Sequence, residues 1–382
     1  MIGAVLSYRS PMLTFTGATE LPDAATSLFD AAGVPWHYGD PLREQRLLAR
    51  GGAVIDRSHR AVIRVTGPDA PVFLNNLLSQ KLIDIAPGFS AAALDLDVQG
   101  HILHHAHISL IDDTFYLDIP SYSRESFGDF LSKMIFWSEV TVEETDLGIL
   151  TILGAPAEFS AADAAGEAVA FTRTVEWSGP RREDVFVPRE HLAAAFKALS
   201  EPLSRAGLMA FTAERIKALE PELRADLDAK SIPHEVHTLI GRGDRLGAVH
   251  LDKGCYRGQE TVARVENLGR SPRLLVLVHI DGSAPLDPQP GDPIEFNGRT
   301  TGRLGSIVHD CDYGPIALAL VKRSALDSGA QLEVIAGAGT EDSEEPAQQV
   351  AVSAMVDRDS LPQDEGVHAG RVAVDKLRGR AN

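Results

Sequence analysis

Helical spacing of apolar residues marks four segments of the chain. The clearest is 123–137, where Phe127, Phe130, Leu131 and Met134 recur at intervals of three and four. The same spacing predicts a helix capped by Asp69, an amphipathic helix over 189–199, and a short helix over 213–219 after Thr212. The alanine-rich run 160–170 contains Gly166 and reads as a surface connection or a frayed helix.

Short apolar runs bounded by turn residues predict strands in the rest of the chain. In the first part these are 62–65, 91–96, 104–110, 114–118 and 147–153. After Pro272 the pattern is all strand, at 274–280, 293–296, 302–309, 316–321 and 350–355, with a charged loop at 341–346. We therefore expect an α+β protein whose C-terminal part is a β-barrel.

Composition narrows the class of protein. The 382 residues include 54 acidic and 36 basic ones, for a formal net charge of −18. Such a field repels a polyanion, so we expect no nucleic-acid partner. No stretch approaches the roughly 18 apolar residues of a membrane span, and residues 1–20 fail as a signal peptide. The two cysteines, Cys255 and Cys311, make no disulfide framework, which predicts free thiols in the cytoplasm.

One loop concentrates candidate chemistry. Cys255 lies between Gly254 and Gly258, with Lys253 two residues before it and Arg257 two residues after it. Both cations favour the thiolate, which is the reactive and metal-binding form of cysteine, so Cys255 and Lys253 are candidate catalytic residues. A reactive thiolate, a ligand for a transient iron–sulfur species and a structural thiol remain open, because one cysteine cannot hold a cluster that usually needs four ligands.

The same loop carries a family resemblance. Lys-Gly-Cys-Tyr-x-Gly-Gln-Glu at 253–260 resembles the signature of the YgfZ family of folate-binding proteins. That family is related to the glycine-cleavage T-protein, an aminomethyltransferase, and acts in the assembly and maintenance of iron–sulfur enzymes. The segments 56–60, 65–70, 261–270 and 302–306 are also similar, so the resemblance spans about 43–350.

The resemblance implies a ring of three subdomains around a folate channel. We expect an N-terminal extension over 1–42 and a discontinuous folate-binding subdomain over 43–135 and 207–270. A ferredoxin-like subdomain would cover 136–206, and the barrel would cover 271–382. The expected ligand is tetrahydrofolate or another folate derivative. The resemblance points to the following cofactor-binding residues: His104, Lys217, Arg257, Gln259, Glu260 and Arg264.

Two departures argue against true aminomethyl transfer. The family has Gly-Gly-x-x-Asp-Asp where this chain has Gly100-His101-Ile102-Leu103-His104-His105, so histidines replace both acids. Lys217 stands where the family has the glutamate that binds the pterin, and Leu219 replaces a glycine. A lysine cannot accept the hydrogen bonds of a pterin edge. A nearby acid, Glu220, Asp226 or Glu235, could take over that role.

The histidines of this region form a second candidate cluster. On a strand His101, His105 and His107 would share one face, while His104 would point to the other. Three imidazoles can hold zinc, but the accompanying carboxylate pattern of a known metal motif is missing, so we predict no metal site.

The resemblance thus implies a folate-binding accessory protein with iron–sulfur proteins or their assembly factors as partners. A folate-dependent aminomethyltransferase and a non-catalytic scaffold that has lost folate are the alternatives.

Overall fold

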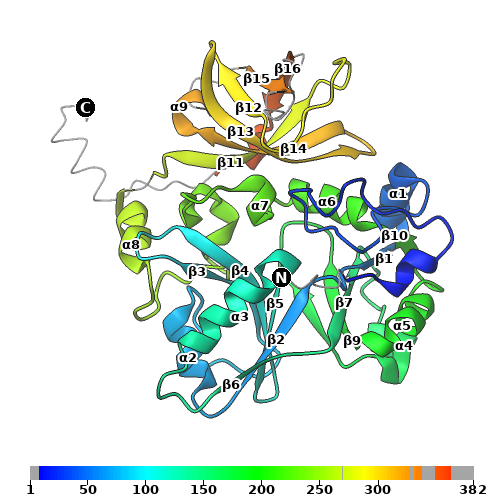
Figure 1. Cartoon of the computed structure of the whole chain (residues 1–382), viewed down its shortest axis with the longest axis vertical. Helices are drawn as coiled ribbons and strands as arrows, with labels where there is room; N and C mark the ends of the chain where they lie inside the picture. Colours follow the sequence, from blue (N-terminus) through cyan, green and yellow to red (C-terminus); the bar gives the residue numbers. More distant parts are fainter. Residues whose placement is uncertain (1–7, 269, 327–330, 338–348, 363–382) are drawn as a thin grey trace, which may run out of the picture.

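The computed structural model describes residues 8–268, 270–326, 331–337 and 349–362. Two five-stranded sheets lie side by side and a closed six-stranded barrel covers one end of both (Figure 1). The α+β class and the C-terminal barrel predicted from the sequence are confirmed.

The first sheet has the strand order β3-β4-β5-β2-β6. Its strands are β2 (Ala61–Thr66), β3 (Ser90–Leu96), β4 (Ile102–Ile111), β5 (Thr114–Ile119) and β6 (Thr141–Glu144). Helices α2 (Ala70–Leu77) and α3 (Arg124–Lys133) pack on it through Phe73, Leu74, Phe127 and Leu131. The apolar stripe read from the sequence therefore faces this core, although α3 ends four residues before the predicted Trp137.

The second sheet has the order β10-β1-β7-β9-β8. It consists of β1 (Ala53–Asp56), β7 (Leu147–Leu153), β8 (Phe171–Val175), β9 (Arg182–Pro188) and β10 (Ser204–Ala206). Helices α4 (Ala161–Ala165) and α5 (Leu192–Leu199) cover one face. The chain passes between the two sheets more than once. Strand β1 comes before every strand of the first sheet but pairs with β7 in the second sheet, whereas β6 pairs with β2 in the first sheet.

The barrel closes in the order β11-β14-β13-β12-β15-β16. Its strands are β11 (Arg273–Ile280), β12 (Pro293–Phe296), β13 (Arg299–Asp310), β14 (Gly314–Lys322), β15 (Leu332–Ala336) and β16 (Val350–Val356), with α9 (Arg323–Leu326) after β14. Strand β15 has no counterpart in the sequence prediction, and the predicted loop at 341–346 lies outside the described residues.

Connecting helices and the N-terminal segment fill the space between the three bodies. The connecting helices are α1 (Pro41–Gly51), α6 (Leu208–Lys217), α7 (Leu223–Asp226) and α8 (Gln259–Leu268). Helix α6 begins after Gly207 and not after Thr212, whose hydroxyl donates to the Leu208 carbonyl inside the helix. Among residues 8–42, Ala31, Val34 and Trp36 are buried in the largest core cluster.

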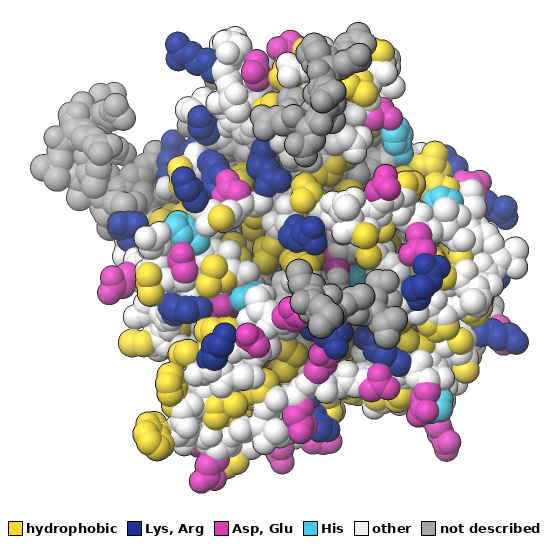
Figure 2. Space-filling model, viewed as in Figure 1, with side chains coloured by type: hydrophobic (Ala, Val, Ile, Leu, Met, Phe, Trp, Pro, Cys, Tyr) yellow, Lys and Arg dark blue, Asp and Glu magenta, His cyan; other side chains and the backbone are white. Residues whose placement is uncertain are grey.

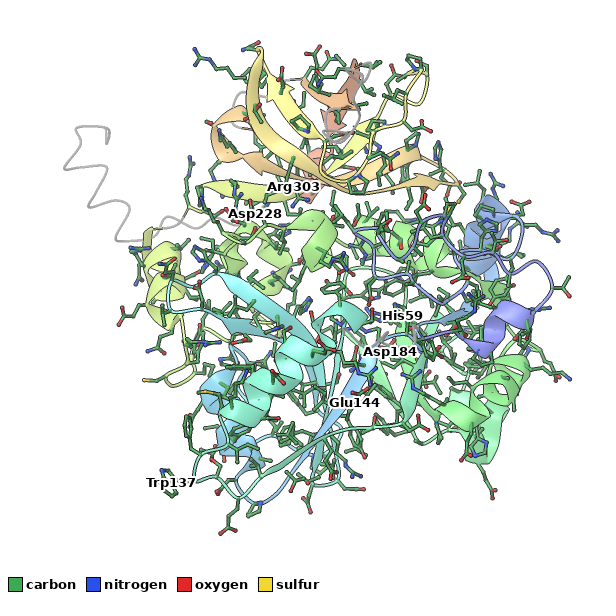
Figure 3. The ribbon with its side chains drawn as sticks, viewed as in Figure 1. His59, Trp137, Glu144, Asp184, Asp228 and Arg303 are labelled. Carbon is green, nitrogen blue, oxygen red and sulfur yellow. The ribbon has the colours of Figure 1, made fainter. Side chains whose placement is uncertain are left out.

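Arginine side chains join the barrel to the rest of the molecule. Arg303 donates to the carbonyl groups of Ala225 and Leu227, and Arg273 pairs with Asp228, two contacts that lie beneath the barrel in Figure 3. Within the described part of the chain, no helix has the length and apolar character needed to cross a membrane.

Candidate functional site

The signature residues form an exposed loop that is tied to the first sheet at both ends. The Lys253 ammonium donates to the carbonyl oxygens of Asn75 and Leu78 at the end of α2. It also lies 4.7 Å from the centre of the Tyr256 ring, and burial lowers the pKa of Lys253 to about 8. Lys253 is thus bound to backbone at the base of the loop, while Cys255 is exposed at its tip.

Arg257 links the loop to one of the predicted histidines. Its Nη2 lies 2.5 Å from Asp95 Oδ1, and the other Asp95 oxygen lies 2.8 Å from His104 Nδ1. His104 Nε2 in turn contacts the Ser126 hydroxyl at 2.9 Å. Arg257 and His104, predicted separately, therefore belong to one polar chain across β3, β4 and α3.

The other four residues predicted to bind cofactor lie apart from this chain. Gln259 Oε1 accepts a hydrogen bond from the Tyr256 amide at 3.1 Å, which closes the loop where α8 begins. Glu260 and Arg264 lie on α8 and are exposed. Lys217 lies on the barrel side of α6, where its ammonium pairs with Glu214 at 2.8 Å and Asp310 at 3.0 Å.

The second cysteine is in a different environment. Cys311 is half-buried at the end of β13, and burial together with Asp310 and Asp312 raises the pKa of its thiol. Among the described residues, Asp310, Cys311 and Asp312 are the one group of three possible metal ligands within 4.8 Å of one another, and Asp310 is already paired with Lys217.

Two cavities meet at the centre of the molecule. The first has a volume of about 710 Å³ including its open mouth. Its walls include the small side chains of Ala91, Ala92 and Ala248 and the flat ring of Trp177. The second lies toward the N-terminal segment and includes Asp30 and Arg57. The two cavities share four lining residues, His105, His107, Glu220 and Pro221, which lie at the boundary between them.

Glu220 is the carboxylate that faces both cavities. It accepts hydrogen bonds from Arg182 Nη1 at 3.0 and 3.2 Å and lies 3.8 Å from His107 Nε2. Burial alone would raise its pKa, but Arg182 and His107 outweigh burial and hold the pKa of Glu220 well below its usual range. Of the three acids considered from sequence, Asp226 pairs with Arg215 and Glu235 with Arg273, so only Glu220 lines the cavities.

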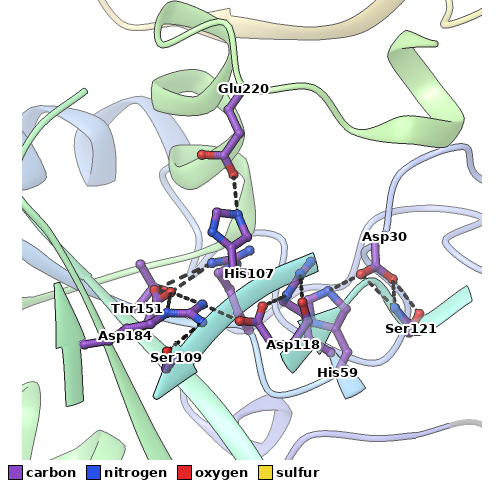
Figure 4. Close-up of polar contacts among 12 residues, drawn as sticks. Asp30, His59, His107, Ser109, Asp118, Ser121, Thr151, Asp184 and Glu220 are labelled. Carbon is purple, nitrogen blue, oxygen red and sulfur yellow. Dashed lines mark hydrogen bonds and ion pairs between the residues drawn. The ribbon is translucent and has the colours of Figure 1, made fainter. Parts of the chain in front are cut away.

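A buried ionic network supports this wall from behind (Figure 4). Asp184 pairs with Arg173 at 2.7 Å and with Arg182 at 3.3 Å, and it accepts a hydrogen bond from Thr151 at 2.6 Å. These charges neutralise each other without solvent, and removing one partner of such a pair typically costs about 3–5 kcal/mol. The network therefore fixes the position of Arg182 and, through it, of Glu220.

The histidine cluster is divided by the strand geometry. The rings of His105 and His107 lie 5.3 Å apart on the cavity side of β4. His101 lies in the preceding turn instead, where its Nδ1 contacts Asp97 at 2.9 Å. The predicted common face of His101, His105 and His107 is wrong, because β4 begins at Ile102.

Comparison with known proteins agrees with this architecture. No protein-family model matches the chain. It is 24% identical over 291 residues to the tRNA-modifying protein YgfZ of Cronobacter sakazakii, covering 72% of this chain and 85% of the relative. The crystal structure of the glycine cleavage system aminomethyltransferase T of Bartonella henselae superposes with a TM-score of 0.71 at 18% identity, covering 89% of this chain and 93% of that one.

The chain is YgfZ-like and has the T-protein fold. A further relative, an Arabidopsis thaliana protein named "Putative transferase, chloroplastic", is 24% identical over 302 residues, which is 73% of this chain and 67% of the relative. The YgfZ-like resemblance read from residues 253–260 is therefore confirmed.

Sequence reasoning missed several residues of the central cavities. Trp177 and Asp30 of the cavity linings, and Arg182 behind Glu220, lie in segments with no motif, whereas Arg57 and His59 belong to the family-like segment 56–60. Nothing in the local sequence indicates that an arginine is fully buried, as Arg182 is with 0% of its surface exposed.

Proposed function

We propose that this YgfZ-like protein binds tetrahydrofolate or a related folate in the central channel and serves iron–sulfur proteins through its Cys255 loop. The observation that carries the proposal is Glu220, a carboxylate whose side chain is only 16% exposed, in a cavity with a flat aromatic wall. Each carboxylate oxygen can accept two hydrogen bonds, so the bonds from Arg182 leave capacity for the amino-pyrimidinone edge of a pterin. Trp177 and the alanines of the first cavity suit a planar ring.

In this proposal Glu220 replaces the family glutamate whose position Lys217 occupies. Helix α6 ends at Lys217, and Leu219 adopts a left-handed backbone conformation with φ of 55°. The chain then turns so that Glu220, three residues after Lys217, lines the two central cavities. The missing glutamate is thus compensated within the same turn.

The proposed catalytic role of Cys255 concerns partner proteins and not the channel. Its thiol is exposed, and the cations beside it in sequence are bound to Asn75, Leu78 and Asp95. We place the protein in the cytoplasm, with iron–sulfur proteins or their assembly factors as partners. The formal net charge of −18 disfavours direct contact with a nucleic acid, and Figure 2 shows basic side chains interspersed with acidic ones on the face drawn. A link to tRNA modification, as in the relative's name, would therefore run through such a protein partner.

Calorimetric titration with tetrahydrofolate tests the channel. We expect binding by the unaltered protein, and a loss of at least about tenfold in affinity for Glu220→Gln, equal to about 1.4 kcal/mol. Glu214→Gln is the matched control, because Glu214 is a buried acid of α6 that pairs with Lys217 outside both cavities. Absence of folate binding would favour the scaffold alternative, and equal affinities of the two variants would contradict the role of Glu220.

Two further measurements separate the remaining alternatives. Methylene-tetrahydrofolate production from an aminomethyl-lipoyl carrier would identify a transferase and overturn the accessory role. In cells that lack the protein, Cys255→Ala should fail to restore the activity of an iron–sulfur enzyme, whereas Cys311→Ala should restore it.

A further inference from the structure

The second cavity contains an Asp–His pair that belongs to none of the roles above. It is lined by Asp30 and Trp36 from the N-terminal segment, by Arg57 and His59 after β1, and by His105 on β4. His59 Nε2 lies 3.3 Å from Asp30 Oδ2, and both side chains are almost fully buried. The N-terminal segment thus supplies a charged group to the wall of the cavity as well as apolar packing.

Asp30 is firmly held as an ionised partner for this imidazole. Its carboxylate accepts hydrogen bonds from the Ser121 amide at 3.1 and 3.2 Å and from the Ser121 hydroxyl at 2.5 Å (Figure 4). Burial opposes ionisation, but His59 and Arg60 together hold the pKa of Asp30 below its usual range. A fixed carboxylate on one ring nitrogen orients an imidazole and favours its protonated form.

Two histidines of this cavity keep a ring nitrogen without a partner. Within the described residues, His59 Nδ1 and His105 Nε2 are buried and have no hydrogen-bond partner. The two residues are only 6% and 7% exposed. Leaving a buried polar atom unpaired is unfavourable, so a ligand that pairs with both nitrogens is stabilised by removing two such penalties.

Of the arginines that line this cavity, Arg57 lies farthest from its nearest carboxylate. Its Nη1 lies 3.7 Å from Asp184 and 3.3 Å from the Thr151 hydroxyl. The other two guanidinium groups of the lining are paired at 2.8 Å, Arg60 with Asp118 and Arg215 with Asp226. Burial and the neighbouring Arg182 and Arg60 lower the pKa of Arg57 to about 9, the direction expected for a buried cation that lacks a close anion.

The carboxylates of the lining do not compete for these donors. Asp30 is bound to His59 and Ser121, and Glu220 is bound to Arg182. Glu222 accepts a hydrogen bond from the Tyr122 hydroxyl, and burial together with Asp30 raises the pKa of Glu222 to about 7. None of these three carboxylates therefore binds His59 Nδ1, His105 Nε2 or Arg57, and an anion that enters the cavity can accept hydrogen bonds from them.

The second cavity is open and somewhat smaller than the first. Its volume is about 590 Å³ including its open mouth, against about 710 Å³ for the first cavity. A small monocarboxylate such as formate or acetate therefore fits within it.

We propose that the second cavity is a binding site for a small monocarboxylate, of the size of formate or acetate, held by Arg57, His59 and His105. Protonated His59 donates from Nδ1 to one carboxylate oxygen, and Arg57 supplies the second positive charge. Neutral His105 donates from Nε2 to the other oxygen. Two cations, Arg57 and His59, then balance two anions, Asp30 and the ligand, which is the condition for placing a charge in a dry interior.

Ligand-observed NMR with ¹³C-formate and with acetate tests the site in the full-length, folate-free protein. We expect saturable binding of both by the unaltered protein and none of methylammonium, which has a similar size and the opposite charge. Asp30→Asn keeps the shape of the side chain but no longer stabilises the His59 cation. This variant should raise the formate Kd at least about tenfold.

Asp97→Asn is the matched control, because it breaks another Asp–His pair, the one with His101, outside the cavity. It should leave the formate Kd unchanged. Equal formate affinity of Asp30→Asn and the unaltered protein, absence of carboxylate binding, or preferential binding of methylammonium would each overturn the site. Circular dichroism confirms that each variant is folded.

The tetrahydrofolate titration keeps this inference separate from the proposed function. Asp30→Asn should retain its folate affinity. Folate binding without formate binding would refute the carboxylate site alone, whereas formate binding without folate binding would refute the folate proposal alone.

Discussion

Gly258 of the signature loop packs directly against Gly100 in the turn between β3 and β4. A β-carbon added at Gly258 would lie 3.0 Å from the Gly100 Cα and 2.6 Å from the Asp97 carbonyl oxygen. Gly258 also has a φ of 82°, which disfavours any residue with a side chain. Two motifs separated by more than 150 residues are therefore held in contact by the absence of side chains.

Gly258→Ala should lower the free energy of unfolding by at least about 1–2 kcal/mol, because the added methyl group meets backbone and the residue has a left-handed conformation. Urea unfolding followed by circular dichroism measures this. Gly254→Ala in the same loop is the control, since nothing lies within 4 Å of its β-carbon position. Similar losses in both variants would contradict the close packing of the two glycines.

Lys253→Met should change how stability depends on pH. Burial lowers the pKa of Lys253 to about 8 from 10.5, so between these values the unfolded chain binds more protons than the folded one. The free energy of unfolding of the unaltered protein should therefore rise from pH 8 to pH 10 relative to that of Lys253→Met. Urea unfolding at both pH values gives the difference. The exposed Lys230→Met should show no such change, and a parallel pH response of Lys253→Met and the unaltered protein would refute the expectation.

Lys217→Glu should not improve folate binding, even though it restores the residue type of the T-protein pattern. The side chain at 217 faces Glu214 and Asp310, so a glutamate there would place three carboxylates together and leave Asp310 without its cation. We expect a loss of about 2–3 kcal/mol in the free energy of unfolding. A gain in tetrahydrofolate affinity, measured by calorimetry, would show that position 217 reaches the ligand and Glu220 does not replace it.

Cys255 should react with iodoacetamide before Cys311 at neutral pH. Cys255 is exposed, whereas Cys311 is half-buried and its thiol pKa is raised by burial and by two neighbouring acids. Mass spectrometry of peptides from a time course measures the two rates. Faster modification of Cys311 would contradict the assignment of Cys255 as the accessible thiol.

Local sequence was sufficient for elements whose pattern is set by neighbours along the chain. The runs 147–153 and 293–296 predicted as strands coincide with β7 and β12. The loop at 253–260 also followed from sequence, because turn residues and a short motif lie within a few positions of each other. The class of fold and the YgfZ-like resemblance depended on the same local information.

Only the tertiary structure decided which residues meet. Strand pairing brings β1 beside β7, and a left-handed turn at Leu219 places Glu220 at the two central cavities while Lys217 contacts the barrel. Asp30 meets His59 because the N-terminal segment folds into the main core. These contacts depend on packing between segments far apart in the chain, where burial and charge pairing act and local spacing carries no information.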